Sequence, residues 1–183
     1  MKIRFLYFNW ALDFTRRDKI YRNYRHDGAY YCVSPWALTW DNENYYLIAY
    51  DPSAPEVSRI RNYRVDKMEN IQLTEEKREG AQHFRGSFSP AAYSRKMFGM
   101  FSGHEEIVRL RCRKDAINIL RDRFGSELMV QPDDSTHFFA SVTVAVSPQF
   151  YAWVVGLNGA VRIVAPQHVC DSFRKLLLEQ LEE

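Results

Sequence analysis

The sequence predicts an α+β protein in which a small β-barrel of the SH3 or Sm type precedes a ferredoxin-like βαββαβ domain. In the first part of the chain, five short aromatic-rich strand patterns follow one another with tight turns and no helical pattern between them. Closing such a sheet into a barrel hides its edges. In the last part, strand and helix patterns alternate in the order βαββαβ, with one more helix at the end. A length of 183 residues with 46% hydrophobic residues supplies enough apolar surface for two cores.

The central hairpin spans residues 30–51. Two apolar, aromatic-rich runs flank the polar turn at residues 41–44, because β-branched and aromatic residues favour strands while Asp and Asn favour turns. Pro35 cannot donate a hydrogen bond to a neighbouring strand, so it predicts a bulge, an edge or a strand start before Trp36. In the second run both alternating faces are apolar. The sequence therefore predicts a curled or covered sheet.

The remaining strands of the barrel are predicted from alternation and from flanking turns. They are Ile3–Trp10, Lys19–Arg25 and Ile60–Val65. The segment Thr74–Gly80 is too charged to pack by itself and predicts a linker. A short helix starts after it, with Ser89 as N-cap and Pro90 at the first helical position, and ends near Gly99. The predicted domains are residues 1–73 and 104–183, joined by a linker with a short helix at 74–103.

Strands and helices in the second domain are marked by apolar periodicity and by Gly or Pro at their ends. The predicted strands are Glu105–Cys112, Leu128–Gln131, Thr136–Val146 and Val161–Ala165, and the predicted helices are Asp115–Phe124, one from Pro148 to Asn158 and one from Pro166 onward. Trp153 lies at helical spacing among apolar residues, so we expect it in the core.

Composition excludes several classes of protein. A net charge of +2 and a pI near 8.4 do not by themselves indicate a nucleic-acid binder. Three widely separated cysteines without a CxxC pair predict free thiols in a reducing cytoplasm. The sequence shows neither a membrane-spanning run nor a signal peptide. Five scattered histidines, and the lack of a phosphate loop or a nucleophile elbow, predict a non-enzymatic protein without catalytic residues, metal or cofactor.

Three ordered motifs resemble the WYL domain of bacterial transcriptional regulators. They are Ser34–Leu38, Tyr45–Asp51 and Tyr63–Met68. Tyr45, Tyr46 and Leu47 match the tripeptide that names the family, with tyrosine in place of tryptophan at its first position. Residues 105–182 resemble the C-terminal extension called WCX. The resemblance implies an SH3/Sm-like barrel that senses nucleic acid or a nucleotide through basic and aromatic residues.

The candidate ligand-binding residues combine arginines with aromatic residues. If Tyr63 and Val65 belong to the core, alternation turns Arg64 outward, where it can bind a phosphate while a neighbouring ring stacks on a base. The resemblance selects Ser34, Tyr46 and Arg64, and strand proximity adds Trp36, Arg61 and Tyr7. The alternative interpretation is that the arginine stems merely cover apolar surface.

In the second domain Arg109, Arg111 and Arg113 share one strand face, because their spacing is two. Such a row either faces solvent or binds an anionic partner. The resemblance implies a sharper version, in which this domain packs over the barrel of another subunit and helps to form its ligand site.

The first hypothesis is a ligand-sensing and dimerisation module of a bacterial transcription factor, which binds an anionic nucleotide or single-stranded nucleic acid. The usual helix-turn-helix of the family is expected to be absent, since Met1 opens directly on the barrel, so DNA would be contacted only through a domain outside this chain. Either the chain is a fragment, or it acts without its own reader of operator DNA. The alternative is a non-catalytic protein-interaction or assembly module without a small ligand. A third hypothesis, an enzyme acting on nucleic acid, requires a carboxylate cluster that the sequence does not show.

Overall fold

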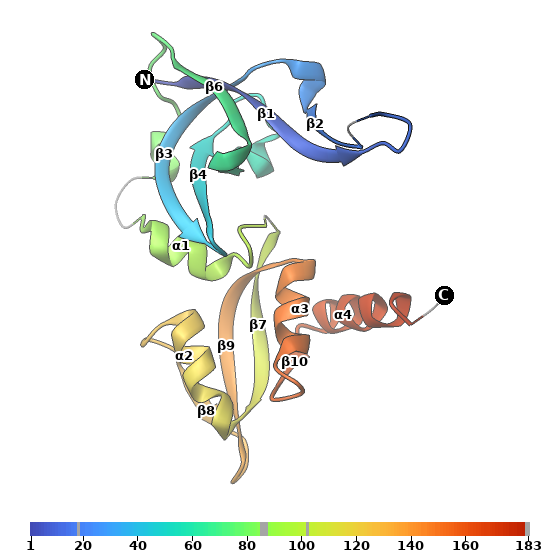
Figure 1. The fold of residues 1–183 in the computed structure, drawn as a ribbon. Helices are drawn as coiled ribbons and strands as arrows, with labels where there is room; N and C mark the ends of the chain where they lie inside the picture. Colours follow the sequence, from blue (N-terminus) through green and yellow to red (C-terminus); the bar gives the residue numbers. More distant parts are fainter. Residues whose placement is uncertain (18, 85–87, 102, 182–183) are drawn as a thin grey trace. The chain divides into compact units, whose positions relative to one another are not determined.

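The computed structural model describes residues 1–17, 19–84, 88–101 and 103–181 and has the mixed α+β composition that the sequence predicts. The chain divides into two compact units, Met1–Ala91 and Ala92–Glu183. The first contains a curled antiparallel sheet, and the second contains a four-stranded antiparallel sheet with helices (Figure 1). None of the described helices combines the length and the apolarity needed to cross a membrane.

The sheet of the first unit has six strands in the order β2-β1-β3-β4-β5, with β6 paired to β1. The bounds are β1 Ile3–Leu12, β2 Ile20–Tyr24, β3 Tyr31–Asp41, β4 Asn44–Tyr50, β5 Ile60–Arg64 and β6 Met68–Leu73. All five predicted strand patterns form strands. The sequence missed β6, because only Met68 of its six residues is buried and the segment shows no apolar alternation.

The β3–β4 hairpin has the predicted turn and the predicted irregularity. Asn42 and Glu43 both have positive φ angles, 44° and 62°, as in the two-residue turns whose twist matches that of the flanking strands. The register between β3 and β4 shifts between Pro35 and Ala37. Of the three alternatives predicted from Pro35, a bulge, an edge or a strand start, the structure shows the bulge.

The core of the first unit consists of residues that alternate onto the inner face of the curled sheet. Its buried members are Phe5, Tyr7, Tyr31, Val33, Leu47, Ala49, Tyr63 and Met68. Four aromatic rings pack together, with Phe5 and Tyr31 stacked at 5.6 Å and Tyr7 and Tyr63 edge-to-face at 5.4 Å between centroids. Burying each such side chain contributes roughly 1.5–3 kcal/mol, so this face dominates the stability of the unit.

Residues 74–84, here called the strap, lie against β3. The Oγ of Ser34 accepts a hydrogen bond from the backbone N–H of Glu79 at 2.8 Å, and the Nε1 of Trp36 donates to the Glu79 carbonyl at 3.0 Å. The ring of Trp36 stacks on that of Phe84, with 4.9 Å between centroids, and the guanidinium of Arg78 lies 4.4 Å from the Trp36 centroid. The first part of the segment that the sequence predicted as a linker is therefore attached to the sheet, through the backbone of Glu79 and the side chains of Arg78 and Phe84.

Two acidic residues of the strap are paired with a buried lysine. The buried ammonium of Lys2 lies 2.9 Å from the carboxylate of Glu76 and 2.6 Å from that of Glu79, and these bonds raise the pKa of Lys2. The linker interpretation rested on the charge of residues 74–80 alone. Pairing with a lysine more than 70 positions earlier removes that objection to packing.

Replacing Ser34 by alanine is expected to loosen the strap. The substitution leaves the N–H of Glu79 without its acceptor, at a cost of about 1 kcal/mol, so the exchange of that amide with solvent hydrogen should accelerate about 5-fold. Ser58→Ala is the matched control, because the Ser58 hydroxyl donates to a carbonyl in an exposed turn. Equal exchange rates of Glu79 in wild type and Ser34→Ala would show that this bond does not fix the strap.

The second unit contains strands and helices in the predicted order. Their bounds are α1 Pro90–Lys96, β7 His104–Arg113, α2 Ile117–Phe124, β8 Val130–Pro132, β9 His137–Val146, α3 Pro148–Gly156, β10 Val161–Ala165 and α4 Gln167–Glu179. The second unit has one short 3-10 turn among its described residues, at Lys114–Ala116, and the first unit has four, at His26–Gly28, Glu56–Ser58, Val65–Lys67 and Ala81–His83. The sheet order is β10-β7-β9-β8, with every neighbouring pair antiparallel.

Helix ends in the second unit follow from local chemistry. Ser147 caps α3 by accepting from the N–H of Phe150, and Gly125 ends α2 with a φ of +95°. Trp153 packs against the core as predicted, with its ring 5.3 Å from Phe98 and 5.7 Å from Phe124. Burial raises the pKa of the Cys112 thiol in this core to about 12, which keeps the thiol protonated.

Candidate ligand-binding site

Five of the six predicted site residues fall into two groups in the structure, and the sixth, Arg61, lies apart from both. Tyr46 and Tyr7 lie beside Arg64, because β4 and β5 pair Tyr46 with Arg64 and the Tyr7 hydroxyl accepts from the Arg64 N–H at 3.1 Å. Ser34 and Trp36 instead fix the strap. Tyr7, Ser34 and Tyr46 are buried, whereas the other three are half-buried. Arg61 lies apart from Arg64, on the opposite face of β5.

Arg64 is already occupied by protein partners. Its Nε and Nη2 donate to the two carboxylate oxygens of Asp66 at 3.1 and 2.8 Å, and Nη2 also donates to the Oδ1 of Asn44 at 2.7 Å. The same bond lowers the pKa of Asp66, so the carboxylate stays charged at neutral pH. An anion approaching Arg64 must compete with this bidentate partner.

A second polar group lies on the inner face of the sheet, and we call it the rim cluster. It consists of Arg25, His26, Tyr31, Asp51 and Arg61. Asp51 is 1% exposed, and it follows Leu47 and Ala49 at a spacing of two, which places it on the core face. Ala49 pairs with Arg61 across β4 and β5, so the acid and the cation end on the same face of neighbouring strands.

Asp51 is the fixed anion of the rim cluster. Its carboxylate accepts hydrogen bonds from the Tyr63 hydroxyl at 2.9 Å and from the N–H and Oγ of Ser53 at 3.0 and 2.6 Å. The Nε of Arg61 lies 3.7 Å from its Oδ2. The carboxylate therefore has all the partners that a buried charge requires.

Arg61 presents free donors. Its Nε donates to the Ser58 carbonyl at 3.4 Å, but among the described residues neither of its terminal amino groups donates a hydrogen bond. The side chain is 30% exposed. A guanidinium that is oriented at one edge and open at the other suits an external carboxylate or phosphate.

Tyr31 presents a second free donor. Its hydroxyl is buried and has no hydrogen-bond partner among the described residues. Burial raises the pKa of Tyr31, while the charges of Arg25 and Arg61 oppose that shift, so the hydroxyl is protonated at neutral pH. The exposed ring of His26 stacks on the Tyr31 ring at 4.4 Å, in a backbone turn with a φ of 51°.

Sequence reasoning predicted Arg61 but missed the other four members of the rim cluster. One signal was present, since an acid two positions after Ala49 on an apolar face marks a carboxylate that must be paired inside the protein. The rim cluster combines hydrogen-bond donors with an exposed ring, which is chemistry for binding an anion that carries a flat group. Among the described residues no His, Cys, Asp and Glu side chains gather in a way that could bind a metal ion.

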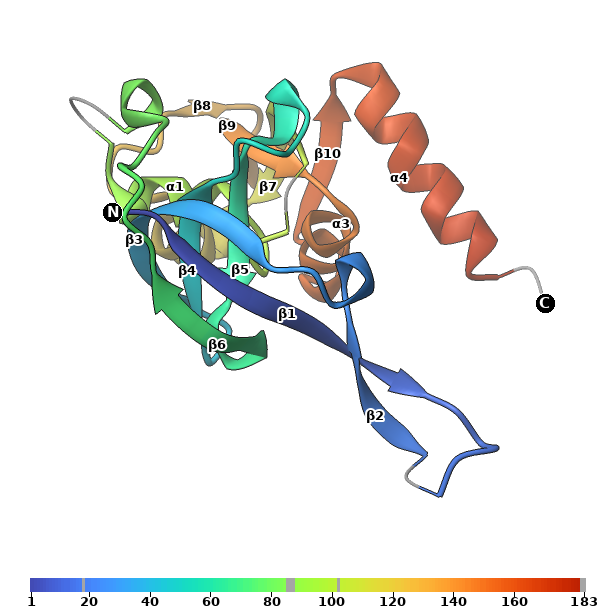
Figure 2. The ribbon, with the colours of Figure 1, turned by 90° about the horizontal axis from the view of Figure 1, so that it is seen from above.

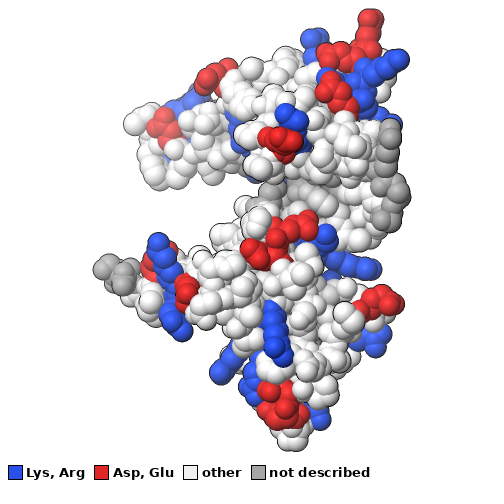
Figure 3. All heavy atoms as spheres, turned by 180° about the vertical axis from the view of Figure 1, so that it is seen from behind, with Lys and Arg blue, Asp and Glu red and all other residues white. Residues whose placement is uncertain are grey.

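In the arginine row of the second unit, two of the three arginines are paired with aspartates of the same unit. Arg111 pairs with Asp133 at 2.6 Å and with Asp134 at 2.8 Å, and Arg113 pairs with Asp115 at 2.7 Å. Arg109 lies 4.0 Å above the Phe139 ring. On the face drawn in Figure 3, basic and acidic side chains are interspersed.

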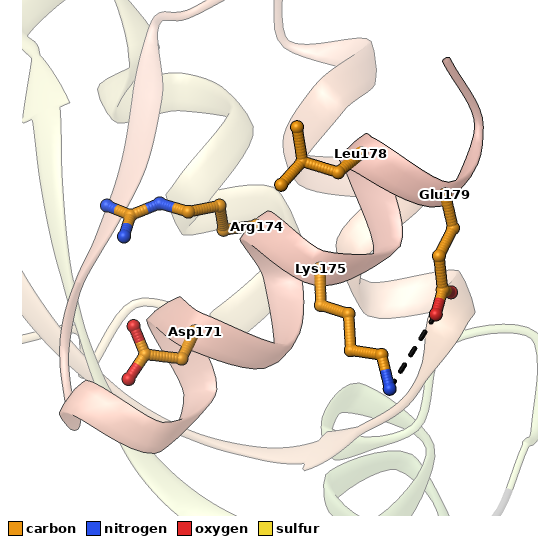
Figure 4. A pocket seen from close by; sticks show the side chains of 5 residues that line it. All are labelled: Asp171, Arg174, Lys175, Leu178 and Glu179. Carbon is orange, nitrogen blue, oxygen red and sulfur yellow. Dashed lines mark ion pairs between the residues drawn. The ribbon is translucent and has the colours of Figure 1, made fainter. Parts of the chain in front are cut away.

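A shallow depression on α4 lacks converging polar groups. All of its lining residues come from this one helix, and Lys175 and Glu179 form an ion pair of 3.7 Å across one turn (Figure 4). Its lining side chains are Asp171, Arg174, Lys175, Leu178 and Glu179. A site for an oriented ligand requires groups from several elements, so the rim cluster is the better candidate.

Comparison with known proteins identifies two families along the chain. The WYL domain matches residues 2–73, and the WCX domain matches residues 104–181. The search of curated proteins found no significant match.

Two solved structures are similar at low sequence identity. Proteasome accessory factor B/C (PafBC) of Arthrobacter aurescens is 20% identical, with a TM-score of 0.38, and the match covers 94% of this chain and 23% of that chain. A CRISPR Cas-related protein is 12% identical, with a TM-score of 0.49, and the match covers 98% of this chain and 46% of that chain. The chain thus spans less than half the length of either structure.

Proposed function

Since the chain belongs to the WYL-domain family, with a WYL domain followed by a WCX domain, we propose that it is a ligand-sensing and dimerisation module of a transcriptional regulator. Its ligand is an anionic nucleotide or a single-stranded nucleic acid, and its site is the rim cluster. In this proposal the protein performs no catalysis, acts in the cytoplasm and contacts operator DNA only through a partner or another domain.

One observation carries the proposal: the terminal amino groups of Arg61 and the hydroxyl of Tyr31 have no partner among the described residues, yet both belong to one face of the sheet. A buried hydroxyl without a partner costs about 1–3 kcal/mol. A ligand oxygen that accepts from it recovers this free energy, and a phosphate bound by Arg61 provides such oxygens.

The stacked His26 ring supports a nucleotide rather than a plain anion. One face of the ring is taken by Tyr31, and the residue as a whole is exposed, so a base can stack on its outer side. Arg25 adds a further positive charge close enough to act on the Tyr31 hydroxyl. Phosphate on Arg61 and a base on His26 match the two halves of a nucleotide.

The finer architecture belongs to the same proposal. The pairing of β6 with β1 adds a sixth strand to the curled sheet and supports an SH3/Sm-like barrel. The strand order β10-β7-β9-β8, with β7 and β9 at the centre, supports a ferredoxin-like second unit. A homodimer in which this unit contributes to the partner's ligand site follows the behaviour expected of the family.

Arg61→Ala is expected to weaken the binding of a fluorescent single-stranded oligonucleotide about 10-fold or more, because a charge-assisted hydrogen bond contributes about 1.5–3 kcal/mol. Fluorescence anisotropy at fixed ionic strength measures the affinity. The control is Arg4→Ala, which removes an exposed arginine of β1 whose Nε donates to Gln72. Arg64→Ala is expected to have a smaller effect than Arg61→Ala, since Asp66 already neutralises Arg64.

An equal loss of affinity in Arg61→Ala and Arg4→Ala would mean that general charge, not the rim cluster, attracts the oligonucleotide. Failure of the wild-type protein to bind any oligonucleotide or nucleotide, combined with dimerisation in solution, would favour the alternative of an assembly module without a small ligand.

A further inference from the structure

The end of β1 and all of β2 form a two-stranded arm, residues 8–25. β1 pairs with β3 only as far as Phe5 and with β6 only as far as Tyr7, and from Phe8 to Leu12 its partner is β2. Figure 2 shows this arm extending past the other strands of its sheet. At the base of the arm Phe8 is buried, at 2% exposure, whereas Trp10 and Leu12 farther along β1 are exposed, so the outer part of the arm lies outside the core.

Large apolar side chains are exposed near the tip of the arm. Leu12 is 58% exposed, Phe14 is 74% exposed and Ile20 is 65% exposed. Leu12 and Ile20 are directly opposite each other, so they share one face of the ribbon, and Trp10 lies on the same face two residues earlier. Such a group on a projecting element marks a surface that contacts a partner.

Positive charge is concentrated on the same arm. Residues 10–25 contain five Lys and Arg against two Asp, a formal charge of +3, whereas the whole chain carries +2. Arg16, Arg17 and Lys19 form no ion pair among the described residues. Asp13 is occupied by the N–H and the Oγ of Thr15, at 2.9 and 2.6 Å.

Some cations of the arm already lie over its aromatic rings. The guanidinium of Arg16 is 4.0 Å from the centroid of Tyr21, and the ammonium of Lys19 is 5.9 Å from that of Phe14. Arg22 lies over Phe8 and Trp10 and also pairs with Glu69. The contacts of Arg22 orient the base of the arm, whereas Arg16 and Lys19 lie over rings at the tip and, like Arg17, remain exposed to an external anion.

We propose that the arm binds duplex DNA, with Arg16, Arg17 and Lys19 on the phosphates and the apolar tip against the groove. The major groove admits a two-stranded β-ribbon, and the thymine methyl groups in this groove offer apolar contacts to the tip. This goes beyond the proposed function and departs from it on one point, because the chain itself would then contact duplex DNA, through the tip of the arm and not through the rim cluster.

The positive charge of the arm favours a polyanionic partner over a second copy of this chain. A second copy of the chain would bring two arms of equal charge together, which opposes association through their tips. Four of the five cations in residues 10–25 are arginines, whose planar donors match phosphate oxygens. An anionic lipid surface is the competing partner for a basic and apolar tip, and the experiment includes it.

The test compares the full chain with the triple variant Arg16→Ala, Arg17→Ala, Lys19→Ala. Binding to a labelled 20-base-pair duplex is measured by anisotropy across a series of salt concentrations. The triple variant is expected to lose about 10-fold or more in affinity at low salt. The slope of log affinity against log salt concentration should be smaller in magnitude by about 2–3, since each phosphate contact contributes about 0.9 to that slope. The matched control removes the same charge from exposed residues of the second unit, in Arg162→Ala, Arg174→Ala, Lys175→Ala.

Three outcomes overturn the proposal: no duplex binding by the wild type, equal losses in the two triple variants, or binding to vesicles with anionic lipid but not to the duplex. Phe14→Ala supports it if duplex affinity falls at an unchanged salt slope. Unchanged thermal unfolding of each variant shows that the arm was altered without the core. Arg61→Ala is expected to retain duplex binding. The proposal that the rim cluster binds a nucleotide and the proposal that the arm binds duplex DNA can therefore fail independently.

Discussion

Replacing Asp51 by alanine is expected to lower the free energy of unfolding by about 3 kcal/mol, because it removes the acceptor for three hydrogen bonds in a buried site. The Tyr63 hydroxyl would remain buried without a partner, and the N–H of the exposed residue Ser53 would lose its acceptor. Arg61 would also lose its nearest negative charge. Urea denaturation followed by tyrosine and tryptophan fluorescence measures the change.

Asp51→Asn separates the roles of charge and shape. The amide keeps one oxygen for the Tyr63 hydroxyl but turns a donor toward the Ser53 N–H, so we expect about half of the alanine effect. A free energy of unfolding of Asp51→Ala within about 0.5 kcal/mol of the wild type would contradict the assignment of Asp51 as the anchor of the rim cluster.

Replacing Gly80 by alanine is expected to destabilise the first unit by about 2–4 kcal/mol, through two physical causes. The φ of Gly80 is +80°, which L side chains rarely adopt. In addition, an added Cβ would lie 2.3 Å from the Cγ of Tyr50, and this ring is buried and stacked on His83 at 5.6 Å. The shift of the thermal unfolding temperature measures the combined cost.

Gly28→Ala is the control for the backbone cause alone. Gly28 has the same φ of +80°, but an added Cβ would meet nothing within 4 Å. We expect Gly28→Ala to cost about 1 kcal/mol, and the difference between the two variants is the steric collision with Tyr50. Equal destabilisation by both would show that the strap does not press against Tyr50 in solution.

Local patterns of the sequence predicted most strands of the first unit, since alternation and turn residues act within a few positions. The β3–β4 hairpin and its bulge at Pro35 are examples, because both depend on nearest neighbours. β6 was missed since its residues are mostly exposed and polar, and it is a strand only through pairing with β1. The capped helix α3 was predicted because Ser147 and Pro148 are a local signal.

The candidate site could be predicted only in part, because register rather than local pattern assembles it. Arg61 reaches Asp51 through the pairing of β4 with β5, and Tyr31 reaches the same face through the pairing of β1 with β3. No spacing rule links positions 31, 51 and 61. Arg64 illustrates the converse, since alternation indicated its outward direction, but the 3-10 turn that returns Asp66 to its guanidinium was not foreseen.

A crystal structure of the protein with a short single-stranded oligonucleotide tests the rim cluster directly. We expect a phosphate within hydrogen-bond distance of the terminal amino groups of Arg61, an oxygen accepting from the Tyr31 hydroxyl, and a base stacked on His26. An oligonucleotide bound elsewhere, with the Tyr31 hydroxyl still without a partner, would contradict this expectation.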